Sequence, residues 1–342
     1  MNFASDNAYG VLPEILDALA EAGRGAVPPY GEDAVTAAMR RRFDLLFQRE
    51  VAIFPVLTGT AANALALATL VPPHGAVLCH ENSHIMVHEC GAPEFFTSGA
   101  KLIGLAGADA KLTPAILAAA LRQMPRGFVH SVQPAAISLS QPTELGTLYT
   151  CQEITAIAVL AHDQGLKLHV DGARFGNAVA ALGVPPADAS WRCGIDVLSF
   201  GASKGGALAA EAVVFFDPRE AHDFEYRRKK AGHLVSKMRF ISAQLTAYIE
   251  NNLWLDSAAN ANALAARLGE GLTAHEIALL APVQTNMVFA ALSAKQCERL
   301  RAAGAQFYDG LPVGDGRAGT RLVTSFATPE ADMTEFLALL DD

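Results

Sequence analysis

The chain is poor in charge, in cysteine and in long apolar runs. Only 18% of its 342 residues are charged, the formal net charge is −9, and the pI lies near 5.6. An acidic surface repels phosphates, so we expect neither nucleic acid nor an anionic membrane as a partner. The N-terminus is polar from its first residues, and no apolar stretch reaches the roughly 18 residues of a membrane helix, which predicts neither a signal peptide nor a membrane span.

Cysteines are too few and too scattered for a disulfide framework. The five, at positions 79, 90, 151, 193 and 297, are odd in number and contain no Cys-x-x-Cys pair. This usage favours reduced thiols, so we expect a cytoplasmic protein. Internal repeats and low-complexity segments are missing as well.

What the chain does contain is 51% hydrophobic residues, enough for a sizeable core. Apolar runs of strand length alternate with segments of helical periodicity, which predicts an α/β fold with a mostly parallel sheet between helices. A nearly continuous helical pattern over 240–268 is expected to bridge a large domain, residues 1–245, and a smaller C-terminal α/β domain, residues 246–342.

The remaining expected elements follow from periodicity and from end signals such as the capping box at residues 150–153. Further helices are expected near 34–47, 60–71, 150–165, 295–303 and 329–340, with another opening at 113–114. Further strands are expected near 51–56, 76–79, 102–105, 136–139, 212–216, 286–292 and 321–326.

Asp171 and Lys204 each follow an apolar, strand-like run. Because the carboxyl ends of parallel strands meet at one edge of a sheet, the carboxylate and the amine would face one crevice. Pyridoxal phosphate (PLP) enzymes need this pair: the lysine holds the cofactor, and the aspartate keeps the pyridine nitrogen protonated so that the ring accepts electrons. Taken singly, Asp171 could be a helix cap, and Lys204 a surface residue in a Gly-rich turn.

The turn at Thr58, Gly59 and Thr60 follows an expected strand and opens an expected helix. Small residues and a helix N-terminus together favour an anion, so the phosphate of the cofactor would fit here. Taken alone, the turn could equally be an ordinary strand-to-helix connection with a threonine cap.

His84 follows another expected strand end, where it could stack on the pyridine ring or lie at the surface as an ordinary histidine. His80, His84 and His88 also have the spacing of metal ligands on one helix face. His80 falls in a strand and turn, however, and no well-placed fourth ligand is evident, so we expect no metal.

Arg174 and Arg321 are candidates for binding a substrate carboxylate. Arg174 lies three residues after Asp171, and Arg321 opens an expected strand. A guanidinium group binds a carboxylate through two parallel hydrogen bonds, although a single arginine is more often a solvated or structural charge. The neighbouring Asp171 and Lys204 favour the binding role for Arg174.

These residues occur in the order found in a known family. The chain resembles the low-specificity L-threonine aldolases, within the β-eliminating lyase group of fold type I PLP enzymes. The blocks at 169–174 (His-Val-Asp-Gly-Ala-Arg) and 203–205 (Ser-Lys-Gly) are the most specific parts of this resemblance. It also includes residues 5–6, 30–33, 58–60, 83–85, 285–287 and 321–324, and so covers nearly the whole chain.

The resemblance implies a role for each candidate. Lys204 would hold PLP, Asp171 would contact its ring nitrogen, and His84 would stack on the ring. The other cofactor contacts would be Gly59, Thr60, Arg174, Ser203 and Arg239, the last from a neighbouring subunit. The substrate would contact Ser5, Arg174, Arg321, Gln141 and Tyr30, the last again from a partner chain. We therefore expect a homodimer or homotetramer with shared active sites.

One segment departs from the common family pattern. Many members have Glu-Asn-Thr-His-Asn-Gly where residues 140–146 of this chain read Ser-Gln-Pro-Thr-Glu-Leu-Gly. Thr143 then replaces a second active-site histidine, and Gln141 or a neighbour replaces the asparagine; this version also looks like a known subgroup of the same aldolases. The expected base is His84, directly or through water, and its rival is a water held by Glu or Gln side chains such as Gln141.

The reaction that the resemblance implies is PLP-dependent retro-aldol cleavage of L-threonine, L-allo-threonine and related β-hydroxy-α-amino acids to glycine and an aldehyde. The alternatives are PLP-dependent β-elimination on a related amino acid and a non-catalytic PLP-binding protein. A metal-dependent hydrolase built on His80, His84 and His88 is a more distant possibility.

Overall fold

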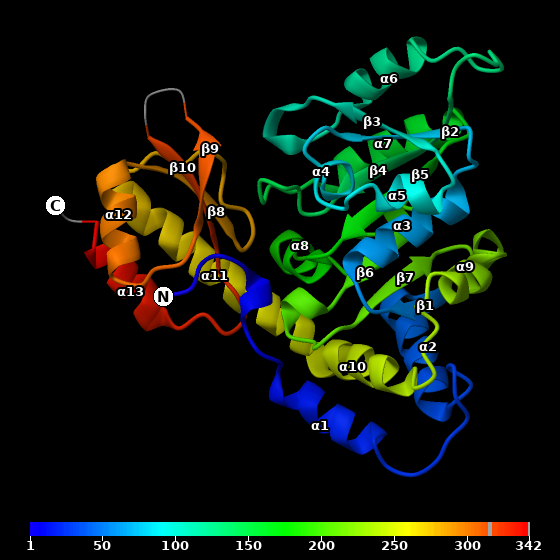
Figure 1. The fold of residues 1–342 in the computed structure, drawn as a ribbon, viewed down its shortest axis with the longest axis horizontal. Coiled ribbons are helices and arrows are strands. Elements are labelled where there is room, and N and C mark those ends of the chain that lie inside the picture. The colour runs from blue at the N-terminus through cyan, green and yellow to red at the C-terminus, as the bar shows by residue number, and fades with distance from the viewer. Residues whose placement is uncertain (314–316, 341–342) are drawn as a thin grey trace.

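The computed structural model describes residues 1–313 and 317–340. They form a large domain around a seven-stranded sheet and a small C-terminal domain around a three-stranded sheet, with helices packed against both (Figure 1). The predicted α/β architecture is confirmed. Within the described residues, no helix is both long enough and apolar enough to cross a membrane.

The large sheet has the strand order β1-β7-β6-β5-β4-β2-β3. Strand β7 runs antiparallel to its neighbours β1 and β6, and the remaining neighbours are parallel. Helices cover both faces, so β2, β6 and β7 are buried along their whole length rather than at alternate residues. The strands are β1 (Ala52–Val56), β2 (Gly75–His80), β3 (Lys101–Leu105), β4 (Gln133–Ser140), β5 (Lys167–Gly172), β6 (Val197–Gly201) and β7 (Glu211–Phe215).

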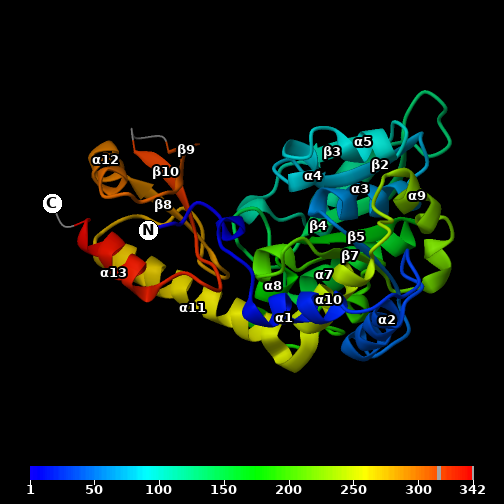
Figure 2. The ribbon, with the colours of Figure 1, turned by 60° about the horizontal axis from the view of Figure 1, so that its bottom comes forward.

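Two groups of helices sandwich this sheet (Figure 2). Val213 and Phe215 of β7 pack in the core under α3 and α9, whereas Ala212 and Val214 pack in the main core on the other face. The first face carries α3 (Gly59–Leu70), α5 (Ala92–Phe96) and α9 (Phe224–Lys230). The second carries α2 (Ala34–Phe47), α6 (Pro114–Arg122), α7 (Cys151–Asp163), α8 (Phe175–Leu182) and α10 (Arg239–Ile249), with α1 (Pro13–Ala22) packed on α10.

The predicted helix starts are confirmed where a cap was visible in the sequence. Thr150 and Glu153 form a complete capping box at the start of α7, and Thr113 caps α6 in front of Pro114. Each cap satisfies a backbone N–H that has no partner within the helix.

The prediction of one nearly continuous helix over 240–268 is wrong. Helix α10 ends at Ile249, a short 3₁₀ turn follows, and α11 (Leu253–Ala274) starts in a new direction. Asn251 and Asn252 adopt left-handed backbone conformations, with φ of +52° and +59°. Asparagine tolerates this conformation better than most residues, and it breaks the helix even though the apolar periodicity continues.

The small domain packs α11, α12 (Ala294–Ala302) and α13 (Glu330–Ala338) on an antiparallel sheet ordered β8-β10-β9. Its strands are β8 (Met287–Leu292), β9 (Tyr308–Pro312) and β10 (Ala318–Val323). The strand expected at 321–326 begins earlier, at Ala318, and ends at Val323. The Thr324 hydroxyl donates to Ala261 O of α11 at 2.7 Å.

The N-terminal residues belong spatially to the small domain. Phe3 donates its N–H to Gln306 O and accepts from Val323 N–H, both at 2.8 Å, and its ring packs edge-on against Phe336. The chain then crosses to the large domain, where α1 begins (Figure 1). Ser5 and Asp6 are thereby placed at the junction of the two domains.

Candidate active site

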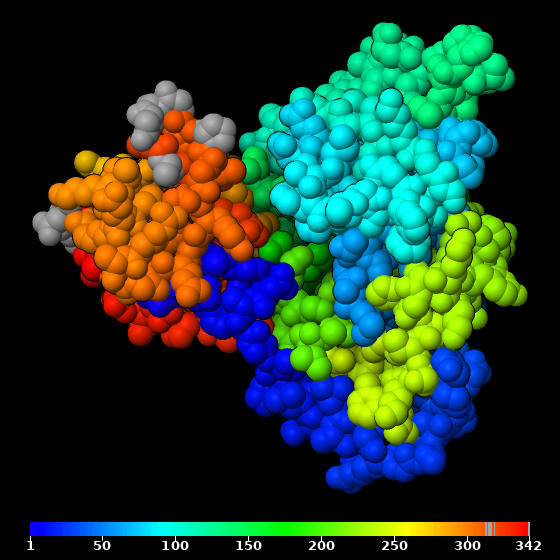
Figure 3. Space-filling view, viewed as in Figure 1, coloured from blue at the N-terminus to red at the C-terminus, as the bar shows by residue number. Residues whose placement is uncertain are grey.

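A pocket opens at the carboxyl ends of the parallel strands, and the molecular surface is hollowed between the two domains (Figure 3). This is the edge of the sheet at which ligands bind in open α/β folds. Of the residues that the sequence indicated, the pocket brings together Gly59, His84, Asp171, Arg174 and Lys204. It is lined by Gly59, Asn63, His84, Ser140, Pro142, Thr143, Glu144, Asp171, Ala173, Arg174 and Lys204.

Lys204 and Asp171 line this pocket from adjacent strands. Strand β6 ends at Gly201, and the 3₁₀ turn that follows carries Lys204. A side chain at Gly205 would collide with the Tyr248 hydroxyl, so glycine lets this turn pack closely. Asp171 is the last residue but one of β5, and its two oxygens accept from Ala173 N at 3.0 Å and from Asn63 Nδ2 at 2.8 Å. The predicted amine and carboxylate thus share one pocket.

The start of α3 provides a place for an anion. Thr58 caps the helix by accepting from Ala61 N–H at 3.2 Å, so Gly59 and Thr60 are left at the positively polarised end with N–H groups that the helix cannot use. Nothing within 4 Å would meet a Cβ at Gly59, so the space in front of this turn is open. A phosphate fits these N–H groups, and PLP therefore fits the pocket at its phosphate end as well as at Lys204 and Asp171.

His84 begins the short helix α4 (His84–Val87), and its side chain is 37% exposed. Its Nδ1 atom lies 2.8 Å from Glu89 Oε1, and this hydrogen bond raises the pKa of His84 above its ordinary value. Its main-chain N–H donates to Glu144 Oε1 at 3.2 Å. The Nδ1 side of the ring is therefore held by the protein, and Nε2 makes no hydrogen bond to another described residue.

Arg174 forms an ion pair with Asp6 that the sequence did not indicate. Its Nε and Nη2 atoms donate to the two oxygens of Asp6 at 2.6 and 2.9 Å. Burial alone would raise the pKa of Asp6, but Arg174 outweighs it and holds that pKa below the usual value. One pocket arginine is thus oriented by the N-terminal segment.

Arg321 lies in β10 of the small domain and is not among the residues that line the pocket. Burial and the nearby charge of Arg174 lower its pKa, and its guanidinium group lies 6.0 Å from the centre of the Tyr308 ring. Two guanidinium groups close enough to perturb each other make a favourable place for a carboxylate. Ser5, which caps a 3₁₀ turn by accepting from Asn7 N, lies next to Asp6 in the same segment.

Seven of the predicted residues do not line the pocket: Ser5, Tyr30, Thr60, Gln141, Ser203, Arg239 and Arg321. Thr60 and Ser203 are the chain neighbours of Gly59 and Lys204, which do. Both amide atoms of Gln141 bond the main chain of Tyr149, Nε2 to its O at 2.8 Å and Oε1 to its N at 3.0 Å. Tyr30 is 44% exposed and carries Lys229 over its ring at 4.8 Å. Arg239 starts α10, where it donates to Gly25 O at 3.3 Å.

Residues 140–146 contribute to the pocket in a different way from that expected. Thr143, at the position of the expected second histidine, lines the pocket and hydrogen bonds to Thr147 Oγ1 at 2.7 Å. Glu144 takes the place in the pocket that was expected for Gln141, and Ser140 Oγ donates to it at 3.4 Å. Glu144 was visible within the Thr-Glu-Leu-Gly string but was not assigned a role.

A buried histidine, His169, supports the strands beneath the pocket. It joins β4, β5 and β6 by bonding Ser138 Oγ through Nδ1 and Ser199 Oγ through Nε2, both at 2.9 Å. Burial lowers its pKa to about 4, so it is neutral at physiological pH. It fixes the strands that end in Asp171 and in the Lys204 turn.

The histidine row that could have indicated a metal site is not on one helix. His80 ends β2 and bonds Gly107 O and Asn82 N–H through its two ring nitrogens, whereas α4 covers only His84–Val87. His84, Glu89 and Asp171 offer ligand atoms within 4.8 Å of one another. The Asn63 amide group, however, already donates to both carboxylates.

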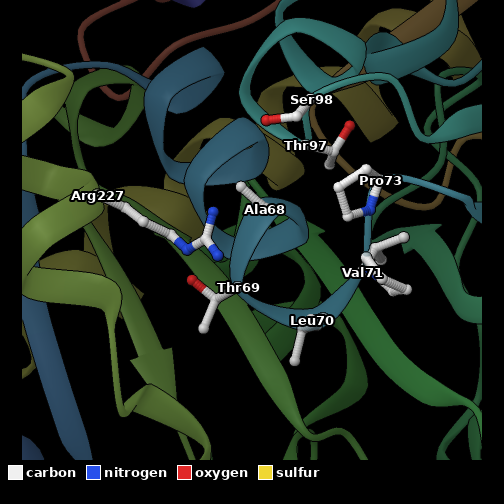
Figure 4. A pocket seen from close by; sticks show the side chains of 9 residues that line it. Ala68, Thr69, Leu70, Val71, Pro73, Thr97, Ser98 and Arg227 are labelled. Carbon is white, nitrogen blue, oxygen red and sulfur yellow. The ribbon is translucent and has the colours of Figure 1, made fainter.

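A second hollow, of about 330 Å³, lies at the other end of α3 (Figure 4). Its wall is formed mainly by residues 68–73, with Thr97 and Ser98 opposite. Its charged group, Arg227, is paired with Asp223 through Nε at 2.8 Å and Nη2 at 2.7 Å. None of the predicted site residues lines this hollow.

Fold and pocket together define a PLP-type site on a fold type I scaffold. The family model described as Beta-eliminating lyase matches residues 2–295, so the chain belongs to this family, as predicted.

Three relatives agree with this assignment. The chain is 42% identical over 339 residues to a low-specificity L-threonine aldolase of a Pseudomonas species, covering 98% of this chain and 96% of that one. It is 43% identical to the corresponding protein of Pseudomonas aeruginosa, covering 95% and 93% of the two chains. A solved threonine aldolase structure from Leishmania major superimposes with a TM-score of 0.94 at 30% identity, over 99% of this chain and 98% of that one.

Proposed function

We propose that this protein is a PLP-dependent aldehyde-lyase that cleaves L-threonine, L-allo-threonine and related β-hydroxy-α-amino acids to glycine and an aldehyde. The observation that carries this proposal is the convergence of Lys204, Asp171 and the N-terminus of α3 on one pocket. The identity of 42% over 339 residues with a threonine aldolase supports it independently.

The pocket residues would hold the cofactor at both ends. Lys204 would bind it covalently, Asp171 would pair with its ring nitrogen, and His84 would lie against its ring. The N–H groups of Gly59 and Thr60 would take the phosphate. Once bound, PLP supplies an electron-accepting ring for the electron pair of the broken Cα–Cβ bond.

Arg174 and Arg321 would bind the substrate carboxylate, with Ser5 beside them. Asp6 already fixes two donors of Arg174, so this guanidinium group is oriented before substrate arrives. Held by these groups, the carboxylate would fix the orientation of the substrate's Cα bonds in the pocket. Such positioning can lower the activation free energy by several kcal/mol, as part of the roughly 7–11 kcal/mol available from proximity effects.

His84 is the proposed base. Its Nδ1 atom is occupied by Glu89, so Nε2 is the atom that would take the proton from the β-hydroxyl group. The rival, a water held by Gln141, has less support because Tyr149 engages both amide atoms of Gln141. A water held by Glu144 fits the pocket better.

We further propose a homodimer or homotetramer in the cytoplasm. Arg239 lines a separate surface hollow, and Tyr30 lies beside it, donating its N–H to Ser236 O at 2.9 Å. Because Arg239 and Tyr30 lie outside the pocket of their own chain, they would reach the active site of a neighbouring subunit rather than their own. All five cysteines are free, which agrees with a reducing compartment.

Product analysis tests the proposal directly. PLP-loaded protein mixed with L-threonine or L-allo-threonine should release glycine and acetaldehyde. Appearance of 2-oxobutyrate and ammonia would instead identify β-elimination, and absence of any turnover with these or bulkier β-hydroxy amino acids would reject catalysis.

The variant Lys204→Ala should abolish product release, because no other lysine lines the pocket formed by the described residues. Lys295→Ala, which removes an exposed lysine on α12, is the matched control and should keep wild-type activity. Normal threonine cleavage by the Lys204 variant, measured as glycine formed per minute, would refute the central assignment.

A further inference from the structure

A second carboxylate lies behind His84 and takes no part in the reaction as proposed. Glu89 follows α4, and its side chain is 0% exposed. Its Oε1 atom accepts from His84 Nδ1 and from Asn63 Nδ2, each at 2.8 Å. Its Oε2 atom is buried without a hydrogen-bond partner among the described residues. A buried, half-bonded carboxylate costs free energy, so this position needs a functional explanation.

Asn63 connects this carboxylate to the cofactor site. One amide hydrogen goes to Glu89 Oε1 and the other to Asp171 Oδ2, each with an N···O distance of 2.8 Å. The amide orientation is assigned from this network, because the flipped amide would place its oxygen against two carboxylates. A continuous chain of hydrogen bonds therefore runs from His84 through Glu89 and Asn63 to Asp171.

The contact with Glu89 also determines where His84 carries its proton. Burial raises the pKa of Glu89, whereas the hydrogen bonds with His84 and Asn63 favour its ionised form. When Glu89 is ionised it can only accept, so Nδ1 donates, and the neutral ring then has its lone pair on Nε2. His84 also faces Asp171 of β5, Glu144 of the loop after β4, and His88, whose ring centre lies 5.7 Å away. Of these groups, Glu89 makes the hydrogen bond to the ring itself.

We propose that Glu89 is a positioning residue that holds a proton on His84 Nδ1, making Nε2 the basic atom, and that fixes the ring relative to Asp171 through Asn63. This inference rests on the proposed function, in which His84 takes the hydroxyl proton. The buried aspartate of a serine protease triad orients its histidine in the same manner.

The variant Glu89→Gln tests the charge with little change of shape, since its amide oxygen can still accept from both donors. We expect kcat for L-threonine to fall about 10- to 100-fold, which is less than the largest contribution of roughly 10⁴-fold from a general base. KM and PLP affinity should remain close to wild type.

The pH profile separates this role from a purely structural one. The hydrogen bond to Glu89 raises the pKa of His84, so its loss should move the acid limb of kcat/KM to lower pH. Glu89→Asp keeps the charge and should return the acid limb toward its wild-type position. An unshifted limb in Glu89→Gln would overturn the proposal.

A measurement that does not depend on turnover keeps the test valid if activity is lost. In ¹³C NMR spectra of histidine-labelled holoenzyme, the His84 signal, assigned by its loss in His84→Asn, should titrate at lower pH in Glu89→Gln. An unchanged titration would reject the proposed role of Glu89. If wild-type protein forms no glycine, the proposed function fails, but this spectrum still decides the His84–Glu89 contact.

Two controls complete the design. Glu94→Gln removes a carboxylate on neighbouring α5 that also has a buried, unbonded oxygen but does not line the pocket, and it should leave kcat and the acid limb unchanged. In a His84→Asn background, Glu89→Gln should lower kcat no further, because both changes remove the same function. Additive losses would show that Glu89 acts independently of His84.

Discussion

At the scale of single residues, the pocket is built from charges that come in pairs. Asp6 holds Arg174, and Glu89 holds His84, so two of the groups with a proposed role toward substrate are each oriented by a buried carboxylate. The side chains of Asp6 and Arg174 are 2% and 10% exposed, which makes their ion pair costly to break on one side only.

Asp6→Ala should therefore destabilise the protein and weaken substrate binding together. Leaving Arg174 buried without its partner is expected to cost about 3–5 kcal/mol, and KM for L-threonine should rise because the guanidinium group loses its orientation. The pKa of Asp6 lies below its ordinary value of 3.8, so this stabilisation is present at neutral pH and is lost only as the pH falls below that value. Denaturant unfolding at pH 7 and at pH 3 measures the free energy of unfolding and its dependence on pH, and steady-state kinetics measures KM.

The control is a surface pair of the same chemistry. Glu330→Gln breaks the contact with Arg267. The Glu330 side chain is 70% exposed and that of Arg267 is 49% exposed, so the loss should cost no more than about 1 kcal/mol of stability. Equal effects of the two variants would mean that the Asp6–Arg174 pair contributes no more than a solvated one.

The sequence predicted those site residues that follow strand ends and missed those that meet them from elsewhere in the chain. Lys204, Asp171, His84 and Arg174 could be found because strand ends mark the edge of a parallel sheet. Asp6 meets Arg174 across a separation of 168 residues. No local pattern shows which distant carboxylate an arginine will contact, so the pairing of Asp6 with Arg174 could be identified only from the three-dimensional structure.

At the scale of elements, α3 combines an ordinary cap with a functional end. Thr58 at α3 and Thr113 at α6 are both exposed threonine caps, accepting from the third residue of the helix at 3.2 and 3.3 Å. Of the two helices, α3 is the one whose first residue, Gly59, lines the active-site pocket. The two helices thus offer a matched comparison.

Thr58→Ala and Thr113→Ala should each cost about 1 kcal/mol of stability, the usual effect of losing a threonine cap. Only Thr58→Ala should also weaken PLP binding, because fraying of the first turn of α3 disturbs the N–H groups that take the phosphate. Pyridoxal, which has no phosphate, should bind both variants alike. Fluorescence titration of the cofactor-free proteins with each ligand provides the comparison, and an equal loss of PLP affinity in both variants would place the phosphate elsewhere.

Element prediction succeeded where local signals were unambiguous and failed where backbone conformation overrode the hydrophobic pattern. The capping box of α7 gave its start correctly, whereas Asn251 and Asn252 interrupt a segment whose apolar periodicity continues. Strand β9 was missed because its Tyr-Asp-Gly-Leu-Pro sequence contains three residues that are uncommon in strands. The division of the chain at residues 245 and 246 stays a prediction.

At the scale of the whole molecule, the two arginines proposed to bind substrate come from both domains, and the N-terminal segment holds one of them. Asp6 accepts from Arg174 of the large domain and, at 3.1 Å, from Asn286 Nδ2, just before β8 of the small domain. Arg321 comes from the small sheet. Assembly of subunits would extend the same principle, since Tyr30 and Arg239 lie outside the pocket of their own chain.

Hybrid oligomers test whether Arg239 serves a neighbouring subunit. Lys204→Ala and Arg239→Ala should each be nearly inactive alone. When the two are mixed under conditions that exchange subunits within dimers, half of the dimers are hybrids.

In each hybrid, one of the two sites combines an intact Lys204 with an intact Arg239 from the other chain, so about a quarter of wild-type activity should return. If Arg239 acted within its own chain, both sites of the hybrid would lack one group and mixing would restore nothing. Glycine release before and after exchange therefore distinguishes a shared site from a self-contained one.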